Sequence, residues 1–216
     1  MSRFSDLVSK PARVMADYFP TPSQNQVHPA APPNLIKLDS NENPFGPSPL
    51  AVEAIQSALA ATHLYPDDDC AQLRRKLAAC HAVSPEQVLV TAGSTEMLSL
   101  LCHTMLAPGL NAVTSERSFI IYGMLVHATG AQFIQAPMHD DAFNLDAMLA
   151  AINPQTRLVF LANPNNPTGT VLDAPPVDKF LAEVPAHVVV VLDEAYYDFA
   201  AHSAALRKVE YSRSLE

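Results

Sequence analysis

The stretch Arg157–Gly169, RLVFLANPNNPTG, joins an apolar run directly to a segment of turn-forming residues. The first six residues are almost continuously apolar, as expected of a strand that is buried on both faces of a sheet. The following NPNNPTG consists mainly of Pro, Asn and Gly, which are the common residues of tight turns. This order predicts a buried strand over 157–162 whose carboxyl end carries a polar loop. The simplest interpretation of that loop is a plain turn leading into the next helix.

The same alternation extends to both sides of this stretch. Apolar runs typical of strands cover residues 87–91, 111–115, 131–136, 157–162 and 187–194. Segments with helical periodicity lie between them, over residues 94–106, 119–129, 144–152 and 177–184. Strands alternating with helices predict an α/β fold with three layers, in which helices cover both faces of a mostly parallel sheet. Ligands of such sheets gather at the carboxyl ends of the strands.

The N-terminal part of the sequence does not show this alternation of strands and helices. Residues 1–33 are rich in proline and show little periodicity, so we expect an extended arm there. Ser48 and Pro49 predict the start of a helix over 50–61, and the acidic residues 67–69 precede a second helix over 70–81. The predicted domains are the arm (1–33), a connecting strip (34–50) and a large domain (51–216).

Composition limits the classes of partner. The 216 residues carry a net charge of −9 and have no long run of basic residues, which argues against nucleic acid and against an anionic membrane surface. No apolar run reaches membrane-spanning length, and the N-terminus has no secretory h-region. The three cysteines form no C-x-x-C pair, as in a protein with reduced thiols. We therefore expect a cytoplasmic protein that binds a small molecule.

Polar residues follow two of the predicted strands and point to a binding site. Gly93, Ser94 and Thr95 stand between a strand and a helix, where free N–H groups, hydroxyls and the helix dipole can hold a phosphate. An ordinary capped helix is the alternative. No G-x-G-x-x-G follows any strand, which removes the main support for a dinucleotide site.

Asp193 ends the most hydrophobic strand of the chain, HVVVVLDE. An acid there is costly unless it is paired, and it is suited to bind the protonated ring nitrogen of pyridoxal phosphate, which makes that cofactor an electron sink. Tyr196 and Asn166 could both reach the phenolic oxygen of the same ring. The alternative is that Asp193 merely caps a helix.

These motifs together resemble those of the pyridoxal-phosphate aminotransferases of fold type I, and most closely the histidinol-phosphate aminotransferase branch. The segments that carry the resemblance are LDSNENPFGPSP (38–49), YPD (65–67), GSTEML (93–98), NPNNPTG (163–169) and DEAYYDF (193–199). The order and approximate spacing also match over residues 35–200. The resemblance implies the large domain of the aspartate aminotransferase-like fold, incomplete at its C-terminus.

The resemblance also implies roles for single residues. Gly93, Ser94 and Thr95 would hold the cofactor phosphate, Phe119 would stack on the pyridine ring, and Asp193, Asn166 and Tyr196 would bind the ring polar atoms. Tyr65 would reach the phosphate from the neighbouring subunit of a homodimer. Asn43, Phe45 and Gly46 would line the substrate entrance, although a plain turn is the competing interpretation. The substrates would be an amino acid or amino-alcohol phosphate and a 2-oxo acid.

One required residue does not match. The family uses a Schiff-base lysine, as nucleophile and general acid–base, on a strand that follows the aspartate motif. None of the five lysines matches it, and we expect the catalytic lysine beyond Glu216 and no activity from these 216 residues alone.

Three alternatives stay open at this point. The same fold and cofactor serve decarboxylases of phosphorylated amino acids, and a non-catalytic truncated homologue would also lack the lysine. A metal-dependent hydrolase could be invoked from the eight histidines and HDD (139–141), but no H-x-x-x-H or H-E-x-x-H pattern occurs, so we predict no metal site.

Overall fold

The structure is a computed structural model that describes residues 11, 13 and 40–200. The described residues form two compact units, which divide between Val90 and Thr91. The proline-rich arm, residues 34–39 of the connecting strip and Lys208 lie outside the described residues. The predicted domain boundaries therefore stay predictions.

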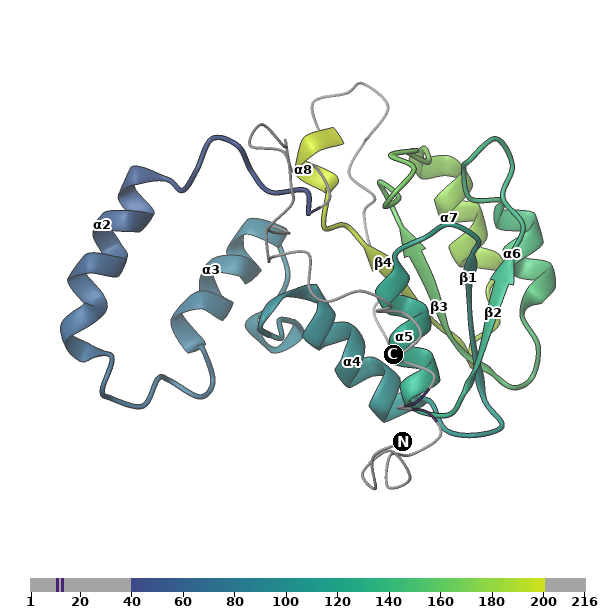
Figure 1. Ribbon diagram of the computed structural model, residues 1–216, viewed down its shortest axis with the longest axis horizontal. Helices are drawn as coiled ribbons and strands as arrows, with labels where there is room; N and C mark the ends of the chain where they lie inside the picture. The colour runs from purple at the N-terminus through teal and green to yellow at the C-terminus, as the bar shows by residue number, and fades with distance from the viewer. Residues whose placement is uncertain (1–10, 12, 14–39, 201–216) are drawn as a thin grey trace, which may run out of the picture. The chain divides into compact units, whose positions relative to one another are not determined.

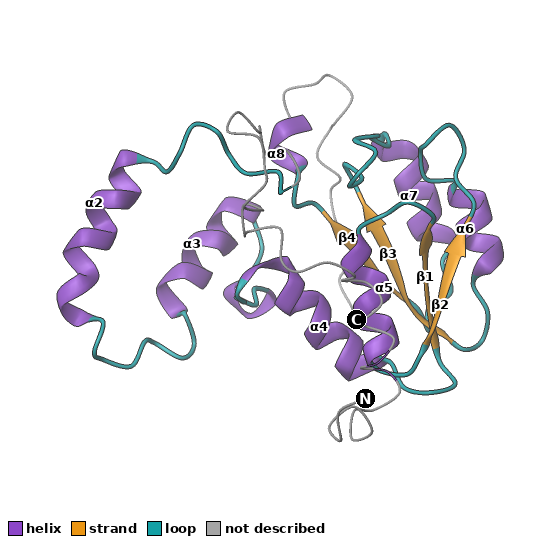
Figure 2. Cartoon of the chain, in the orientation of Figure 1, coloured by secondary structure: helices purple, strands orange, loops and turns teal. Residues whose placement is uncertain are grey.

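The C-terminal unit is built around a sheet of four parallel strands (Figure 1). The strands are β1 (Asn111–Ser115), β2 (Gln132–Ala136), β3 (Thr156–Ala162) and β4 (Val189–Asp193), in the spatial order β2-β1-β3-β4. The helices are α4 (Gly93–Met105), α5 (Ile120–Ala128), α6 (Leu145–Ala151), α7 (Ala174–Glu183) and α8 (Tyr197–Ala200). Figure 2 shows the regular alternation of strand and helix from β1 onward. The predicted α/β fold with a parallel sheet is confirmed.

The two central strands are the most buried part of the sheet. Every residue of β1 is buried, and β3 is buried except at Arg157. The edge strands β2 and β4 are only partly buried. Phe160 and Leu161 of β3 are fully buried and belong to the main core, together with Tyr122 of α5 and Phe180 of α7.

The helices cover both faces of the sheet. Helix α4 contacts α5, and α6 contacts α7. The chain moves one way along the sheet from β1 to β2 and the opposite way from β2 to β3 and β4. Because such crossovers are right-handed, α5 lies on one face while α6 and α7 lie on the other (Figure 1). The direction of winding thus changes between the neighbouring strands β1 and β3, which is where ligands bind in sheets of this kind.

The predicted strand over residues 87–91 was wrong. Residues Pro85–Gln87 form a short 3-10 helix, η3, and the backbone is extended at Val88 without joining a sheet. An extended segment becomes a strand only when another strand pairs with it, and no described residue does so here. Leu89 is accordingly 64% exposed.

The N-terminal unit contains α2 (Pro49–Ala58), the 3-10 helix η2 (Leu59–Ala61) and α3 (Ala71–His81). Helix α3 begins where predicted, because the Asp67 carboxylate accepts hydrogen bonds from the N–H groups of Asp69 and Ala71. Arg74 of α3 donates two hydrogen bonds to the Pro85 carbonyl, which ties α3 to η3. None of the helices in residues 40–200 is long and apolar enough to cross a membrane.

Candidate functional site

A small cavity lies at the carboxyl ends of β3 and β4, beside the start of α5. Its volume is about 70 Å³. Five predicted cofactor-binding residues line it: Ser94, Phe119, Asn166, Asp193 and Tyr196. Tyr122, Ala162, Pro164 and Ala195 complete the lining. Segments that are far apart in the sequence therefore place an acid, an amide, a phenol and an aromatic ring around one small space.

Strand pairing positions Asp193 in this cavity. Its partner across the sheet is Ala162, the last residue of β3, so the two strands end together. The carbonyl of Asp193 accepts a hydrogen bond from the N–H of Asn163 at 3.0 Å. The side chain accepts from the Ala195 N–H through Oδ1 at 3.1 Å and from the Tyr122 hydroxyl through Oδ2 at 2.7 Å. The carboxylate is paired, as an acid at the end of an apolar strand needs to be.

Tyr122 is a site residue that the sequence analysis missed. Its side chain is fully buried, and its ring stacks on Phe160 with centroids 4.7 Å apart and planes at 7°. Burial, together with the neighbouring Asp193 charge and the hydrogen bond to it, raises the pKa of Tyr122 above the usual range. The phenol therefore stays protonated, and stays a donor, at alkaline pH values where an exposed tyrosine ionises. In the sequence, a tyrosine within an apolar helix cannot be distinguished from an ordinary core residue. The sequence therefore contained no indication that Tyr122 contacts Asp193.

The asparagines of the NPNNPTG loop have different tasks. Asn163 and Asn165 are buried, whereas Asn166 is half-buried and lines the cavity. Asn163 pairs with the backbone of Leu172, accepting from its N–H at 2.9 Å and donating to its carbonyl at 3.0 Å. This pairing closes the base of the loop. The bonds Asn163–Pro164 and Asn166–Pro167 are both cis.

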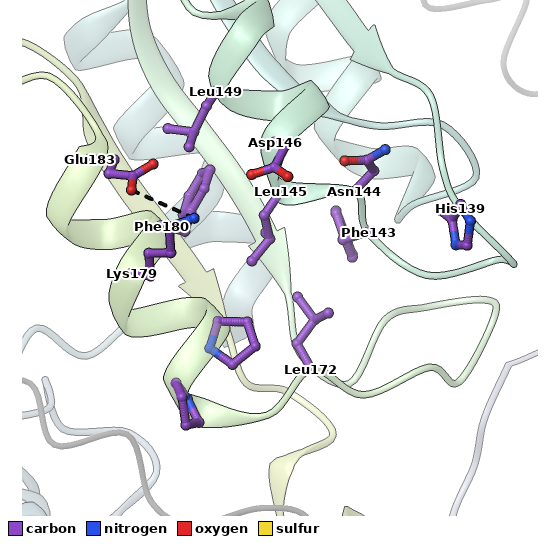
Figure 3. A pocket seen from close by; sticks show the side chains of 12 residues that line it. His139, Phe143, Asn144, Leu145, Asp146, Leu149, Leu172, Lys179, Phe180 and Glu183 are labelled. Carbon is purple, nitrogen blue, oxygen red and sulfur yellow. Dashed lines mark ion pairs between the residues drawn. The ribbon is translucent and has the colours of Figure 1, made fainter.

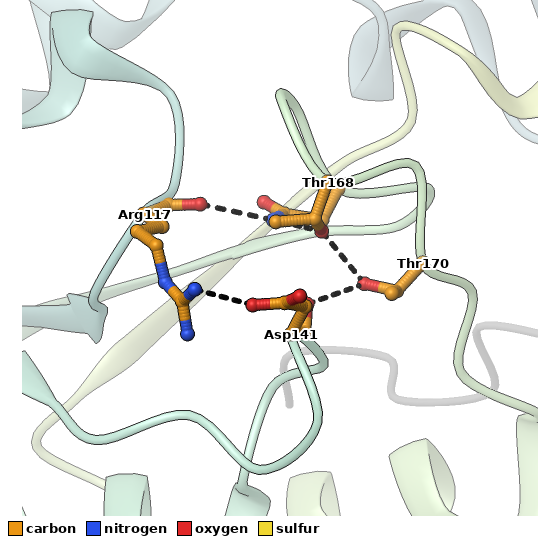
Figure 4. Close-up of polar contacts among 5 residues, drawn as sticks. Arg117, Asp141, Thr168 and Thr170 are labelled. Carbon is orange, nitrogen blue, oxygen red and sulfur yellow. Dashed lines mark hydrogen bonds and ion pairs between the residues drawn. The ribbon is translucent and has the colours of Figure 1, made fainter.

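Asn165 ties this loop to the loop that follows β1. Its amide nitrogen donates to the Arg117 carbonyl at 3.1 Å and to Thr168 Oγ1 at 2.8 Å, and its oxygen accepts from Ser118 Oγ at 3.0 Å. Figure 4 shows how the network continues through Thr170 to Asp141, whose carboxylate forms an ion pair with Arg117. Asn165 and this network thereby hold together three loops at the carboxyl edge of the sheet.

We predict that Asn165→Ala destabilises the protein by roughly 1–3 kcal/mol, the cost of leaving buried hydrogen-bonding groups unpaired. The side chain is 3% exposed, so water cannot easily replace the three lost bonds. Urea unfolding measures the loss, and limited proteolysis should cut the loop 163–173 more readily. Gln135→Ala removes an exposed amide from β2 and serves as the control, with a change within about 0.5 kcal/mol. Equal unfolding midpoints for the two variants would contradict the prediction.

Helix α4, beside the cavity, begins within one residue of its predicted start. Gly93 opens α4 at φ +78°, in the left-handed region that glycine favours. Glu96 accepts a hydrogen bond from the Ala92 N–H, while the first-turn N–H groups that follow, including those of Ser94 and Thr95, have no acceptor within the helix. Ser94 lines the cavity, whereas Gly93 and Thr95 flank it and are exposed.

The remaining candidate residues lie in the N-terminal unit. Asn43, Phe45 and Gly46 form a tight turn in which the Asn43 side chain accepts from the Phe45 N–H at 3.0 Å. Phe45 is 92% exposed and Tyr65 is 96% exposed. Large aromatic side chains so exposed are unusual, but their predicted roles at a substrate entrance and at a partner's cofactor stay predictions.

A larger hollow of about 620 Å³ lies between α6 and α7 (Figure 3). Its lining is mostly apolar, and its Lys179 and Glu183 pair with each other along α7. It contains none of the predicted site residues. Within residues 40–200 no group of three His, Cys, Asp or Glu side chains could hold a metal ion.

Comparisons with known proteins identify the family. Residues 33–214 match the model of the family described as aminotransferase class I and II. Histidinol-phosphate aminotransferase 2 of Pseudomonas aeruginosa is 45% identical over 206 residues, which cover 93% of this chain and 55% of that protein. Histidinol-phosphate aminotransferase of Ruegeria pomeroyi is 44% identical over 166 residues, 77% of this chain and 46% of that protein. The chain thus spans about half the length of the curated relatives it matches.

Solved structures agree with this assignment. The histidinol-phosphate aminotransferase of Sinorhizobium meliloti, in complex with pyridoxal-5'-phosphate, matches with a TM-score of 0.71 and 32% identity over 74% of this chain and 44% of that chain. A putative histidinol-phosphate aminotransferase of Erwinia carotovora atroseptica matches with a TM-score of 0.73 and 30% identity over 79% of this chain and 50% of that chain. The family model matches most of the chain, and the fold agrees with it. The chain therefore belongs to the class I and II aminotransferases.

Proposed function

We propose that the intact protein is a pyridoxal-phosphate-dependent aminotransferase of the histidinol-phosphate type, which transfers an amino group to a 2-oxo acid. The observation that carries the proposal is the cavity at the carboxyl ends of β3 and β4, lined by Ser94, Phe119, Asn166, Asp193 and Tyr196. The similarity to histidinol-phosphate aminotransferases supports the choice of substrate.

The donor set fits this cofactor on chemical grounds. A carboxylate suits a protonated ring nitrogen, an amide and a phenol suit the ring oxygen, and an aromatic ring suits a flat heterocycle. The open N–H groups at the start of α4 suit a phosphate. When bound, pyridoxal phosphate supplies an electron sink for bonds at the substrate α-carbon.

Each residue then has one task. Asp193 would keep the ring nitrogen protonated, Asn166 and Tyr196 would hold the ring oxygen, and Phe119 would stack on the ring. Gly93, Ser94 and Thr95 would hold the phosphate, together with Tyr65 from the neighbouring subunit of a homodimer. Asn43, Phe45 and Gly46 contribute to the substrate entrance.

The reaction also needs a lysine to bind the cofactor covalently and to move the substrate proton. Of the lysines in residues 40–200, Lys76 and Lys179, neither lines the cavity. We propose that this lysine comes from a part of the protein outside the 216 residues, and that these residues alone do not turn over the substrate.

The proposal is tested by incubating the intact protein with pyridoxal phosphate, histidinol phosphate and 2-oxoglutarate. Formation of glutamate at the rate at which histidinol phosphate disappears is expected. Histidinol phosphate has no carboxyl group, so the decarboxylase alternative needs a second assay with a phosphorylated amino acid. Release of carbon dioxide from that substrate, without glutamate formation from histidinol phosphate, would instead assign a decarboxylase. A protein that does not bind pyridoxal phosphate at all would overturn the proposal in both forms.

Asn166→Ala is expected to weaken the binding of pyridoxal phosphate by roughly 10- to 100-fold, the usual effect of losing a hydrogen bond to a charged oxygen. The measurement is a titration of the intact protein followed by the absorbance of the bound cofactor. Asn144→Ala is the control, because Asn144 caps α6 by accepting from the Ala147 N–H and does not line this cavity. An unchanged dissociation constant for Asn166→Ala would contradict a role of Asn166 in cofactor binding, and the loop would then be a plain turn.

A further inference from the structure

We propose that Tyr122 is the positioning residue that holds the Asp193 carboxylate in place for the ring nitrogen of the cofactor. This inference rests on the proposed function, because it assigns a partner to the residue that would bind that nitrogen.

The two oxygens of the carboxylate are fixed from two directions. The Tyr122 hydroxyl donates to Oδ2 at 2.7 Å, from helix α5, and the Ala195 N–H donates to Oδ1 at 3.1 Å, from the segment that follows β4. Two donors on different oxygens prevent rotation of the group about its terminal bond. A carboxylate has about four acceptor positions, so each oxygen keeps capacity for a further donor.

Tyr122 itself cannot easily move. Its ring lies between two other rings, stacked on Phe160 at 4.7 Å and in edge contact with Phe119 at 5.6 Å and 88°. The side chain is fully buried. Its hydroxyl bonds a residue that lines the cavity, and its ring touches Phe119, which lines the cavity as well. One rigid side chain therefore fixes both the carboxylate and the aromatic wall.

Tyr122 could also have a purely structural role, in which Asp193 merely supplies the hydrogen-bond acceptor that a buried hydroxyl needs. The distance between the two side chains would then be the same. The two roles differ in energetic coupling. A residue that acts through Asp193 loses its effect on the ligand once Asp193 is changed, whereas a residue with a purely structural role contributes independently.

The test is a double-mutant cycle on the intact protein with pyridoxal phosphate as the probe. Tyr122→Phe keeps the stacked ring and removes only the hydroxyl. We expect it to weaken cofactor binding roughly ten-fold, which corresponds to about 1.4 kcal/mol, and to change the absorption spectrum of the bound cofactor. Asp193→Ala removes the acceptor of the Tyr122 hydroxyl. In that background, Tyr122→Phe should cause no further change in the dissociation constant.

Thr114→Val is the matched control. Thr114 is buried in β1, and its hydroxyl donates to the Phe160 carbonyl at 2.9 Å without touching Asp193. This variant should lose stability and keep the dissociation constant of the wild type.

Two results would overturn the inference while leaving the proposed function intact: wild-type affinity in Tyr122→Phe, or additive effects of Tyr122→Phe and Asp193→Ala. A wild-type protein that fails to bind pyridoxal phosphate would overturn the proposed function and this inference with it.

Discussion

Asp193→Ala should reduce the affinity for pyridoxal phosphate by roughly 10- to 150-fold, since a charge-assisted hydrogen bond to the ring nitrogen is lost and such bonds contribute roughly 1.5–3 kcal/mol each. The same change should lower the free energy of unfolding by roughly 1–3 kcal/mol, because the fully buried Tyr122 hydroxyl loses its acceptor. Titration with the cofactor measures the first effect, and urea unfolding of the cofactor-free protein measures the second.

Asp193→Asn separates the two effects. The amide oxygen can still accept from the buried Tyr122 hydroxyl, and the Ala195 N–H, which then loses its acceptor, is exposed to water. The stability should therefore fall less than in the alanine variant, but an amide does not keep a ring nitrogen protonated. Affinity should fall in both variants, and stability mainly in the alanine variant. Asp178→Ala, which removes an exposed acid from α7, is expected to change neither quantity. Wild-type affinity in Asp193→Asn would contradict the role of Asp193.

Phe160→Ala is expected to destabilise the protein by roughly 3–5 kcal/mol, the cost of truncating a large aromatic residue in a closely packed core. Phe160 is fully buried at the centre of β3 and stacks on the ring of Tyr122. Such a loss is a large fraction of the 5–15 kcal/mol that typically stabilises a folded protein. The urea unfolding midpoint is the measurement.

Phe199→Ala is the control for this prediction. Phe199 is 80% exposed, so the same truncation removes little buried surface and should change stability by about 0.5 kcal/mol or less. The prediction fails if the two variants unfold at similar urea concentrations. Cofactor affinity should also fall in Phe160→Ala, since the cavity left behind frees the ring of Tyr122.

Much of the fold could be predicted from the sequence because periodicity and burial agree. The runs NAVTS, AQFIQA and RLVFLA all became parallel strands, and each helix between them was expected within a few residues. The segment QVLVT has the same local character and yet forms no strand, because pairing is a property of the neighbouring chain and not of the segment. Local sequence does not contain that information.

Some residues of the candidate site could be predicted from the sequence, and others could not. Asp193 and Asn166 stood out because polar residues at the ends of apolar strands are unusual, and the structure places both at one cavity. Tyr122 did not stand out, because its importance comes from a partner far along the chain. The separate tasks of Asn163 and Asn165 were hidden for the same reason, since their partners Leu172, Arg117 and Ser118 belong to other loops or lie several residues away.

The hydrogen bond from Tyr122 to Asp193 joins residues that are 71 positions apart, and this separation affects the order of folding. Contacts between distant residues form slowly, because the chain must lose the entropy of closing a long loop before it gains them. The cavity therefore cannot exist until β4 has docked beside β3, so a probe of the hydrogen bond between Tyr122 and Asp193 should report that docking step. A ligand that binds only the assembled cavity stabilises the state in which β4 is docked. It should therefore slow the release of β4 from β3 during unfolding.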